Sequence, residues 1–544
     1  MINFQDDRKK LNTTFKNSKD ILMLDIKALG RSAVLCFIDG LTNKEIIDRN
    51  VIEPLKKCDI NFKVNQSERF NSTIKNIDCI DITSLIAEDE NCNLTDFCNQ
   101  TDLNTDSNNQ NPEQNCLIRE QNCVEVENKN VITADLINKI IYITDPIIVC
   151  ETFDEMVKHI ASGDVGLMID GADKYFVLSL RDYKVRGITE PPVSTVLRGP
   201  REGFVEDMKV NMTMLRRRFK TPDLVFDLMQ VGKYSGTQIA VAYLDGVAEP
   251  AVVEEIKKRI GKIDCDGIID SSYVAKYIED NQYSLFNQVG MAEKPDIIAG
   301  KILEGRVAII CDGSPTVLTL PFVLFEHFQS SEDYYIKSYR ASTSRILRVL
   351  AMIIAICLPA AYVALQEFQY HMFPLKLLVV IMNSLQGVPL TPTIEMIVLL
   401  LVFEILNEAS VRMPRYVGTA LSIVGAIVLG ESAVSAGLLS VPALLVTATS
   451  TIGLYCVPDE VNSGSILRIL FVGIAGVLGI FGLIIAVIVL FAYMVSLENY
   501  GTAYLAPFSP LLLSDMQDAI AKDNLIDMKK RPFSIPTKNR TRAK

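Results

Sequence analysis

The sequence has 544 residues, which is enough for several domains of about 100–200 residues each. It is 49% hydrophobic and 22% charged, with a net charge of −11, yet its mean hydropathy of +0.23 is high for a soluble chain. These values fit together only if apolar and charged residues lie in different parts of the chain. Residues 1–344 are mixed and polar, 346–497 are mostly apolar, and 498–544 end in a basic tail. This distribution argues against a wholly soluble enzyme, and the acidic balance argues against a nucleic-acid binder with an overall basic surface.

The sequence lacks the residue patterns of familiar metal, cofactor and catalytic sites. Three histidines are too few for a histidine-rich metal site, and the twelve cysteines form neither a CxxC pair nor a zinc-finger spacing. The motifs GxxxxGKS/T, GxGxxG, HExxH and GxSxG are absent. We therefore expect no metal, no cofactor and no enzymatic activity, unless an unfamiliar site is present. The N-terminal residues MINFQDDRKKLN have no apolar core like that of a secretory signal, so we expect this region in the cytoplasm.

The polar region alternates short β-branched runs with amphipathic runs, which predicts an α/β or α+β fold in two subdomains, residues 1–190 and 191–344. The predicted strands are 21–29, 33–39, 166–170, 175–180, 224–231, 239–245, 307–311 and 316–320. The predicted helices are 44–56, 153–161, 250–260 and 274–279. Residues 88–130 interrupt the pattern with ten Asp or Glu against two basic residues, so we expect a disordered insertion there.

Residues 345–500 predict an all-α polytopic membrane domain, because about 20 apolar residues in a helix cross a bilayer. We expect four to six membrane segments, about five, at 346–365, 393–411, 416–436, 442–457 and 469–497. The last has 29 residues without a charge, so we expect it to tilt or protrude. Residues 375–389 are apolar but short, and we expect them to be re-entrant or interfacial.

Basic residues flank this domain at both ends. Lys337, Arg340, Arg345 and Arg348 precede or open the first segment, which favours a cytoplasmic N-terminal side. The C-terminal segment, residues 501–544, ends in a basic tail that favours the cytoplasm as well. Five membrane segments would place it on the opposite side, so the sequence leaves the number open.

Acidic residues within the apolar region are costly in lipid and should face protein or water. Glu404 and Glu408 lie on one helical face, and Arg412 extends that row by one turn. A Glu408–Arg412 ion pair at the membrane interface is one interpretation. The other is a cation path, for which Glu404, Asn407 and Glu408 are the candidate residues. Glu395, at the opposite end, is expected at the interface.

Two stripes of small residues predict close helix packing, either within one subunit or between subunits. The first stripe is Gly418, Ser422, Ala426 and Gly430, and the second is Ala475, Gly479, Gly482 and Ala486.

The stretch 191–207, PPVSTVLRGPREGFVED, opens the second subdomain and is the most distinctive in the chain. With Asn211 and the LRRR run at 215–218, it resembles the hallmark of the GerA spore germination family, in its A-subunit branch. The resemblance continues in order through 241–248, 312–315, 404–415, 422–426 and 504–507, and covers about residues 140–515. The polar insertion lies outside it, and Glu431 stands where the family pattern has an uncharged polar residue.

This resemblance implies a germinant receptor subunit in the inner membrane of an endospore, with its N-terminal region on the cytoplasmic side. It implies a polytopic B subunit that binds nutrients, a C-subunit lipoprotein and further copies of the chain itself as partners. Such A subunits are thought to form an ion channel that nutrients open. Two other functions remain open from the residues: a secondary transporter, and a non-conducting scaffold or paralogue that amplifies germination.

Arg198, Arg201 and Glu202 lie in a glycine-punctuated loop that leads into a helix predicted from Phe204. These charges are candidates for assembly between subunits through bidentate arginine–carboxylate pairs. An internal salt-bridge network that fixes the two subdomains is the alternative, with phosphate binding as a third. Arg217 and Arg218 are expected near the C-terminal end of that helix, where the helix dipole favours cations.

Overall fold

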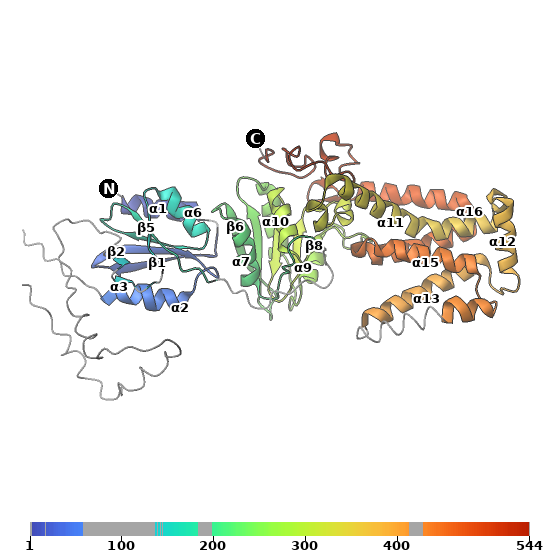
Figure 1. The fold of residues 1–544 in the computed structure, drawn as a ribbon, viewed down its shortest axis with the longest axis horizontal. Coiled ribbons are helices and arrows are strands. Elements are labelled where there is room, and N and C mark those ends of the chain that lie inside the picture. The colour runs from blue at the N-terminus through green and yellow to red at the C-terminus, as the bar shows by residue number, and fades with distance from the viewer. Residues whose placement is uncertain are drawn as a thin grey trace, which may run out of the picture.

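A computed structural model describes residues 3–16, 18–57, 137–182 except 139, 142 and 144, 198–412 and 428–542. Three regions follow one another along the long axis: two sheets with helices, then a bundle of helices (Figure 1). The predicted insertion at 88–130 and most of the predicted membrane segment at 416–436 lie outside the described residues.

The first sheet is antiparallel, with strand order β1-β2-β4-β5-β3. Alternate residues of β2 face opposite sides, so the sheet carries a core on each face. Helices α1 and α6 cover one face, while α2, a π-helical turn and α3 cover the other (Figure 1). The bounds are α1 Phe4–Thr14, β1 Ile21–Ala28, β2 Arg31–Ile38, α2 Lys44–Ile47, the π turn Asp48–Ile52, α3 Glu53–Lys57, β3 Ile148–Cys150, α6 Phe153–Ala161, β4 Val165–Ile169 and β5 Tyr175–Leu178.

The second sheet repeats this topology, with strand order β6-β7-β9-β10-β8. Helices α7 and α10 pack on one face, and α8 and α9 on the other. The bounds are α7 Met208–Arg218, β6 Leu224–Val231, β7 Thr237–Leu244, α8 Pro250–Gly261, α9 Ser271–Ile278, β8 Gly290–Ala292, α10 Pro295–Leu303, β9 Val307–Cys311 and β10 Val317–Leu320.

The expected strands and helices of both sheets are confirmed within a few residues at their ends. The helix expected from Phe204 instead begins at Met208, so that prediction is wrong by about one turn. Asp207 is the reason: its carboxylate accepts hydrogen bonds from the N–H groups of Lys209 and Val210 and thereby caps the helix. Phe204 is buried in the core beside the cap.

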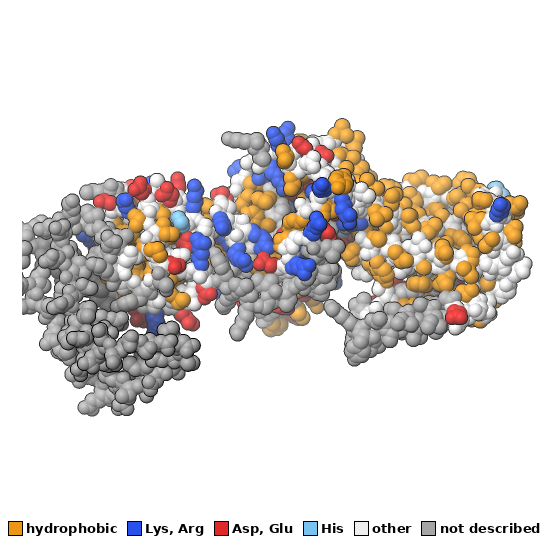
Figure 2. All heavy atoms as spheres, viewed as in Figure 1, with side chains coloured by type: hydrophobic (Ala, Val, Ile, Leu, Met, Phe, Trp, Pro, Cys, Tyr) orange, Lys and Arg blue, Asp and Glu red, His pale blue; other side chains and the backbone are white. Residues whose placement is uncertain are grey.

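A short linker carries the chain from the second sheet into the helical region. It contains the 3-10 helices η3 (Leu324–Phe328) and η4 (Ser331–Tyr334). The helices that follow are α11 Ser338–Glu367, α12 Leu375–Leu385, α13 Pro392–Arg412, α15 Val441–Tyr455 and α16 Val461–Ser496, with the π-helical η6 Val428–Ala433 and the 3-10 helix η7 Pro458–Glu460 between them. Hydrophobic side chains cover the surface of this region, whereas charged side chains gather over the sheets and the linker (Figure 2).

Among the described residues, two helical runs are long and apolar enough to cross a membrane by length and composition, Ser338–Glu367 and Pro458–Ser496. Helices α12 and α15 are also apolar but shorter. The expected re-entrant segment at 375–389 forms α12, which lies at the end of the bundle farthest from the sheets (Figure 1).

Helix α16 is folded back on itself at Gly479, which has φ +62° and ψ −149°. Ser463, near its start, donates to the Leu285 carbonyl (2.8 Å), and Tyr493, near its end, donates to the Ser284 hydroxyl (3.1 Å). Both ends of α16 therefore lie against the same loop of the second sheet region. In a straight helix, residues 474 and 482 would be about 12 Å apart. A Cβ on Gly482 would instead lie 3.0 Å from the carbonyl oxygen of Ile474, so the chain reverses its direction between them.

The expectation that 469–497 forms one tilted span is therefore wrong. Residues 461–478 and 480–496 form two antiparallel helices joined at a backbone conformation that is essentially restricted to glycine. The second small-residue stripe, Ala475, Gly479, Gly482 and Ala486, is buried in this hairpin. These residues permit the two halves to approach closely.

The chain also returns to the second sheet after α16. The short strands β11 (Glu498–Asn499) and β12 (Thr502–Ala503) follow, and Asn499 donates to the carbonyl groups of Gln288 and Phe322. Farther on, Thr537 forms a β-bridge with Ala248, a residue that follows β7. The helical region thus begins and ends on the same side, next to the second sheet.

We expect Gly479→Ala to destabilise the hairpin, because alanine is strained at this φ and ψ by about 1–3 kcal/mol. The new methyl group would also meet the Phe368 ring at about 3.1 Å. Thermal unfolding of the purified protein in detergent should show a lower melting temperature. Gly473→Ala is the matched control, because a Cβ there meets nothing within 4 Å. Equal melting temperatures for the two variants would contradict the hairpin.

Candidate functional site

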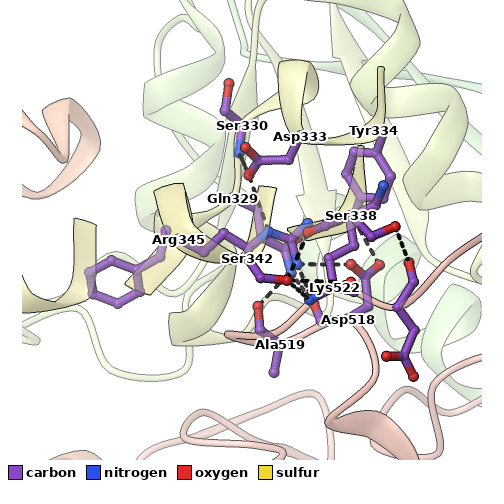
Figure 3. A network of polar contacts seen from close by, with 12 residues as sticks. Gln329, Ser330, Asp333, Tyr334, Ser338, Ser342, Arg345, Asp518, Ala519 and Lys522 are labelled. Atoms are coloured by element: carbon purple, nitrogen blue, oxygen red, sulfur yellow. Dashed lines mark hydrogen bonds and ion pairs between the residues drawn. The ribbon is translucent and has the colours of Figure 1, made fainter. Parts of the chain in front are cut away.

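A buried network of charges joins the linker, the first turns of α11 and the C-terminal segment (Figure 3). Its centre is Arg345, which is fully buried. The guanidinium donates to the Asp333 carboxylate in η4 (3.1 Å) and to the Asp518 carboxylate in the C-terminal segment (2.9 Å). It also donates to the carbonyl groups of Asp518 and Ala519, both at 3.0 Å. One side chain therefore holds together segments that lie 173 residues apart in sequence.

Arg348, one turn further along α11, shares the Asp333 carboxylate. Its guanidinium donates to both oxygens of Asp333, at 2.8 and 3.1 Å, and to the Phe328 carbonyl. Burial alone would raise the pKa of Asp333, but hydrogen bonds from Arg348 and the Ser330 N–H, together with both guanidinium charges, hold the pKa below its ordinary value. Asp333 is therefore ionised, and its negative charge compensates the guanidinium charges of Arg345 and Arg348.

A second cluster of charges lies beside this network and fixes α10 to η3. Glu326 forms ion pairs with Lys301 (2.6 Å) and Arg306, and Arg306 also contacts Glu304 (3.2 Å). Burial opposes ionisation of Glu326, but the two cations outweigh it and lower the pKa of this carboxyl. On the adjacent residue, the His327 ring lies 2.8 Å from the Glu460 carboxylate in η7, the turn between α15 and α16.

The motif loop packs against the same linker. Gly199 has φ +117°, and a Cβ there would lie 2.6 Å from the Tyr335 ring, so only glycine fits. Tyr335 follows η4 and donates to the Asp296 carboxylate (2.8 Å). The candidate assembly residue Glu202 accepts from Arg218 (2.9 Å) and lies 3.7 Å from Arg217, within the second subdomain.

The other candidate assembly residues, Arg198 and Arg201, are exposed in this chain. The LRRR run has a different role in the structure. Arg216 is buried, donates to both oxygens of Asp20 (2.7 and 2.9 Å) and thereby ties α7 to the first subdomain. The N-terminal part of the motif, residues 191–197, lies outside the described residues.

The candidate ion-path residues lie on α13. The Glu404 carboxylate is 36% exposed and accepts from Arg468 (3.0 Å) and Ser465 (2.9 Å) in the first half of α16. Arg468 is 1% exposed and also donates to Thr451 in α15, so its guanidinium connects three helices. Asn407 is half-buried.

The other acids of the helical region differ in their surroundings. Glu408 forms an exposed ion pair with Arg412 (2.5 Å). Glu395, expected at the membrane interface, is fully buried within the protein and accepts from the Ser440 N–H (2.5 Å).

Sequence reasoning missed Arg468 and His327. Arg468 carried a usable signal, because it is the sole charge between residues 461 and 496. Its partner Glu404 lies 64 residues away, so no spacing rule connects the pair. Of the first small-residue stripe, Gly418, Ser422 and Ala426 lie outside the described residues, and Gly430 falls in η6.

Two helix-covered sheets joined through buried charges to an apolar helical bundle define a class of protein in which a polar region is attached to apolar helices. The model of the family described as "Bacillus/Clostridium GerA spore germination protein" matches residues 9–534. This chain belongs to that GerA family. The family and the apolar helices together indicate membrane association.

Named relatives agree with this assignment. Spore germination protein KA of Bacillus subtilis is 37% identical over 72% of this chain and 72% of its own length. Spore germination protein A1 of the same organism is 32% identical over 72% and 80%, and spore germination protein GerLA of Bacillus cereus is 31% identical over 77% and 85%. The crystal structure of the N-terminal domain of the A subunit of the Bacillus megaterium spore germinant receptor GerK3 is 24% identical, with a TM-score of 0.35, over 58% of this chain and 94% of that one.

We expect Arg345→Leu to destabilise the junction by about 3–5 kcal/mol, because it removes the buried guanidinium between Asp333 and Asp518. Asp333 then keeps only Arg348 as a cationic partner, and Asp518 keeps only the Tyr334 hydroxyl. Limited proteolysis of the purified protein should then cleave the C-terminal segment faster, and the melting temperature should fall. Arg340→Leu on the same helix is the control, because that side chain is exposed. An unchanged cleavage rate in Arg345→Leu would contradict the role of the network.

We expect acid to weaken the same junction. Because the folded state lowers the pKa of Asp333, its carboxylate stabilises the fold above the unfolded pKa of about 3.9, and the contribution is lost as the pH falls through the folded pKa. As the pH is lowered from about 7 to 3, the melting temperature should fall less steeply in Asp333→Asn than in the wild type. The variant is already destabilised at neutral pH. Parallel curves for the wild type and the variant would argue against this assignment.

Proposed function

We propose that this chain is the A subunit of a spore germinant receptor and helps to couple nutrient sensing to ion release. Family membership supports a role in spore germination. The similarity to spore germination proteins KA, A1 and GerLA, each over more than two thirds of this chain, supports the choice of the A subunit. A nutrient-binding B subunit, a C-subunit lipoprotein and further copies of this chain are the proposed partners.

The observation that carries the coupling role is the buried Arg345 network. Moving the sheets relative to α11 would separate Arg345 from Asp333 or Asp518 and leave the buried charges only partly compensated, which is costly. A change in the soluble region is therefore passed to α11 as a rigid movement. A nutrient can drive that movement only if it binds one arrangement more tightly than the other.

The same geometry supports a membrane topology. Since the helical region begins and ends beside the second sheet, a membrane around it would be crossed an even number of times, four or six rather than five. We place residues 1–344 and 501–544 on one side, and the basic residues around the start of α11 favour the cytoplasmic face of the spore inner membrane.

We further propose that several copies assemble into a cation channel, with Glu404, Asn407 and Glu408 near the ion path. Arg468 neutralises Glu404 in this arrangement, so the ion pair is suited to a closed state. Opening would need the pair to rearrange, because a paired carboxylate has little attraction left for a passing cation. Arg198, Arg201 and Glu202 remain our candidates for contacts between subunits.

We expect Arg468→Met to impair germination, because it leaves Glu404 partly buried and uncompensated between α13 and α16. In spores that carry the double variant Glu404→Gln and Arg468→Met, function should partly recover, since neither charge remains. The measurement is early cation release after nutrient addition, in a strain lacking the native gene. Glu255→Gln on the surface of α8 is the control. Cation release at wild-type rates in all variants would contradict an ion path here.

A secondary transporter is the second candidate, because the glycine break in α16 resembles the broken helices that bind substrates in transporters. Saturable counterflow of a labelled solute in proteoliposomes would favour it over a channel. A non-conducting scaffold would show neither counterflow nor conductance in the presence of all partners.

A further inference from the structure

A cavity of about 370 Å³ lies where the second sheet meets the helical region, in the size range of small-molecule sites. Its described walls come from β8, β10, α10, η3 and η4, from Asp459 in η7 and from Arg542 in the C-terminal tail. Segments that are distant in sequence therefore meet around one space. Neither the motif loop residues nor the candidate ion-path residues line it.

Most charges in the walls are already paired with one another. Lys301 and Arg306 neutralise Glu326 and Glu304. The Asp296 carboxylate accepts from Tyr335, and the buried Lys294 ammonium lies 3.8 Å from it. This part of the cavity is close to neutral and has little capacity left for a charged ligand.

The wall formed by His327 is different, because one imidazole faces two carboxylates. His327 is 92% buried, and its ring lies 2.8 Å from a Glu460 oxygen and 4.0 Å from an Asp459 oxygen. The orientation is unsuitable for hydrogen bonds: among the described residues, both ring nitrogens of His327 and both oxygens of Glu460 lack a hydrogen-bond partner. Glu460 is 1% exposed, so its charge is poorly compensated. This corner of the cavity therefore favours a cation that can donate hydrogen bonds.

The remaining wall is apolar. Val289, Ile297 and Phe322 line it, and the Phe322 ring lies 4.7 Å from the His327 ring, beside the acidic corner. An aromatic ring beside the Asp459 carboxylate suits an organic ammonium group, because the carboxylate binds the charge and the ring contacts the apolar body. A metal ion is disfavoured, because no group of three or more His, Cys, Asp or Glu side chains with suitable geometry occurs among the described residues.

We propose that this cavity binds a small organic ammonium compound, with its nitrogen at Asp459 and His327 and its apolar body against Ile297 and Phe322. Asp459 is accessible, with 61% of its side chain exposed, and lies near Nδ1 of His327. Glu460 lies against the other ring nitrogen, Nε2, and adds negative charge next to the site. Because Asp459 and Glu460 belong to the turn between α15 and α16, an occupied site joins the second sheet to the hairpin. The ligand would thus stabilise one arrangement of these two regions.

The test is a direct binding measurement on the purified full-length chain in detergent, by calorimetry and thermal shift. Benzylamine is the probe, and benzyl alcohol is its neutral counterpart of similar shape. We expect saturable binding of benzylamine with a raised melting temperature, and at least about tenfold weaker binding of benzyl alcohol. Phenylalanine, which adds a carboxylate, and potassium chloride should not compete. This assay involves no spores, so its failure would leave the proposed function untouched.

Two kinds of variant localise the binding. Asp459→Asn and Glu460→Gln keep the side-chain shapes and should each weaken benzylamine binding by about tenfold, and the exposed Asp459 can be changed without unfolding the protein. Gly300→Leu should abolish binding by filling the cavity, because a Cβ at Gly300 meets nothing within 4 Å. Gly261→Leu at the end of α8, distant from the cavity walls, is the control and should bind normally.

Several results would overturn the proposal. These are equal binding of benzylamine and benzyl alcohol, competition by phenylalanine or potassium, full binding in Gly300→Leu, and no binding of benzylamine at millimolar concentration.

Discussion

The structure depends on the burial of Arg345 between two aspartates that belong to different parts of the chain. Removing two or three charges from water is costly, and the cost is offset only while every partner stays in place. Asp333 comes from the linker and Asp518 from the C-terminal segment, so the network forms only when both segments dock on α11. The position of the apolar helices relative to the second sheet is therefore set by electrostatics rather than by a shared hydrophobic core alone.

Similar ion pairs occur between the regions and within the bundle. Arg216 and Asp20 join the two sheets, Glu326 with Lys301 and Arg306 joins α10 to the linker, and Glu404 with Arg468 joins helices of the bundle. Each pair is directional and tolerates little displacement, in contrast to apolar contacts. Together with the core that Phe286 and Phe322 share with the bundle, these pairs fix the regions relative to one another.

The sequence predicts the local structure well because local patterns encode it. The alternation in β2 and β7 and the Pro at the start of α8 sufficed to place these elements. The three-residue strands β3 and β8 escape detection, since three residues show no period. The repeated sheet topology was missed as well, because repetition of strand order leaves no repeat in the residues.

The candidate site could be predicted only in part. Glu404 and Glu408 are visible as acids in an apolar run, but the partner of Glu404 is set by tertiary packing. The reversal of the chain at Gly479 cannot be predicted from the sequence, because a glycine in an apolar run is compatible with both a helical and a reversed backbone. No motif around His327 indicates a site, and its contact with Glu460 depends on the positions of α15 and α16.

The C-terminal segment has a consequence for biosynthesis. Asp518 and Thr537 are made after all the apolar helices, yet Asp518 completes the Arg345 network and Thr537 extends the second sheet region at Ala248. While the ribosome is still translating this end, Arg345 has no counterpart for one side of its guanidinium. The junction can therefore close only after every apolar helix has been translated, and its closure by the last residues fastens the helical bundle to the sheets.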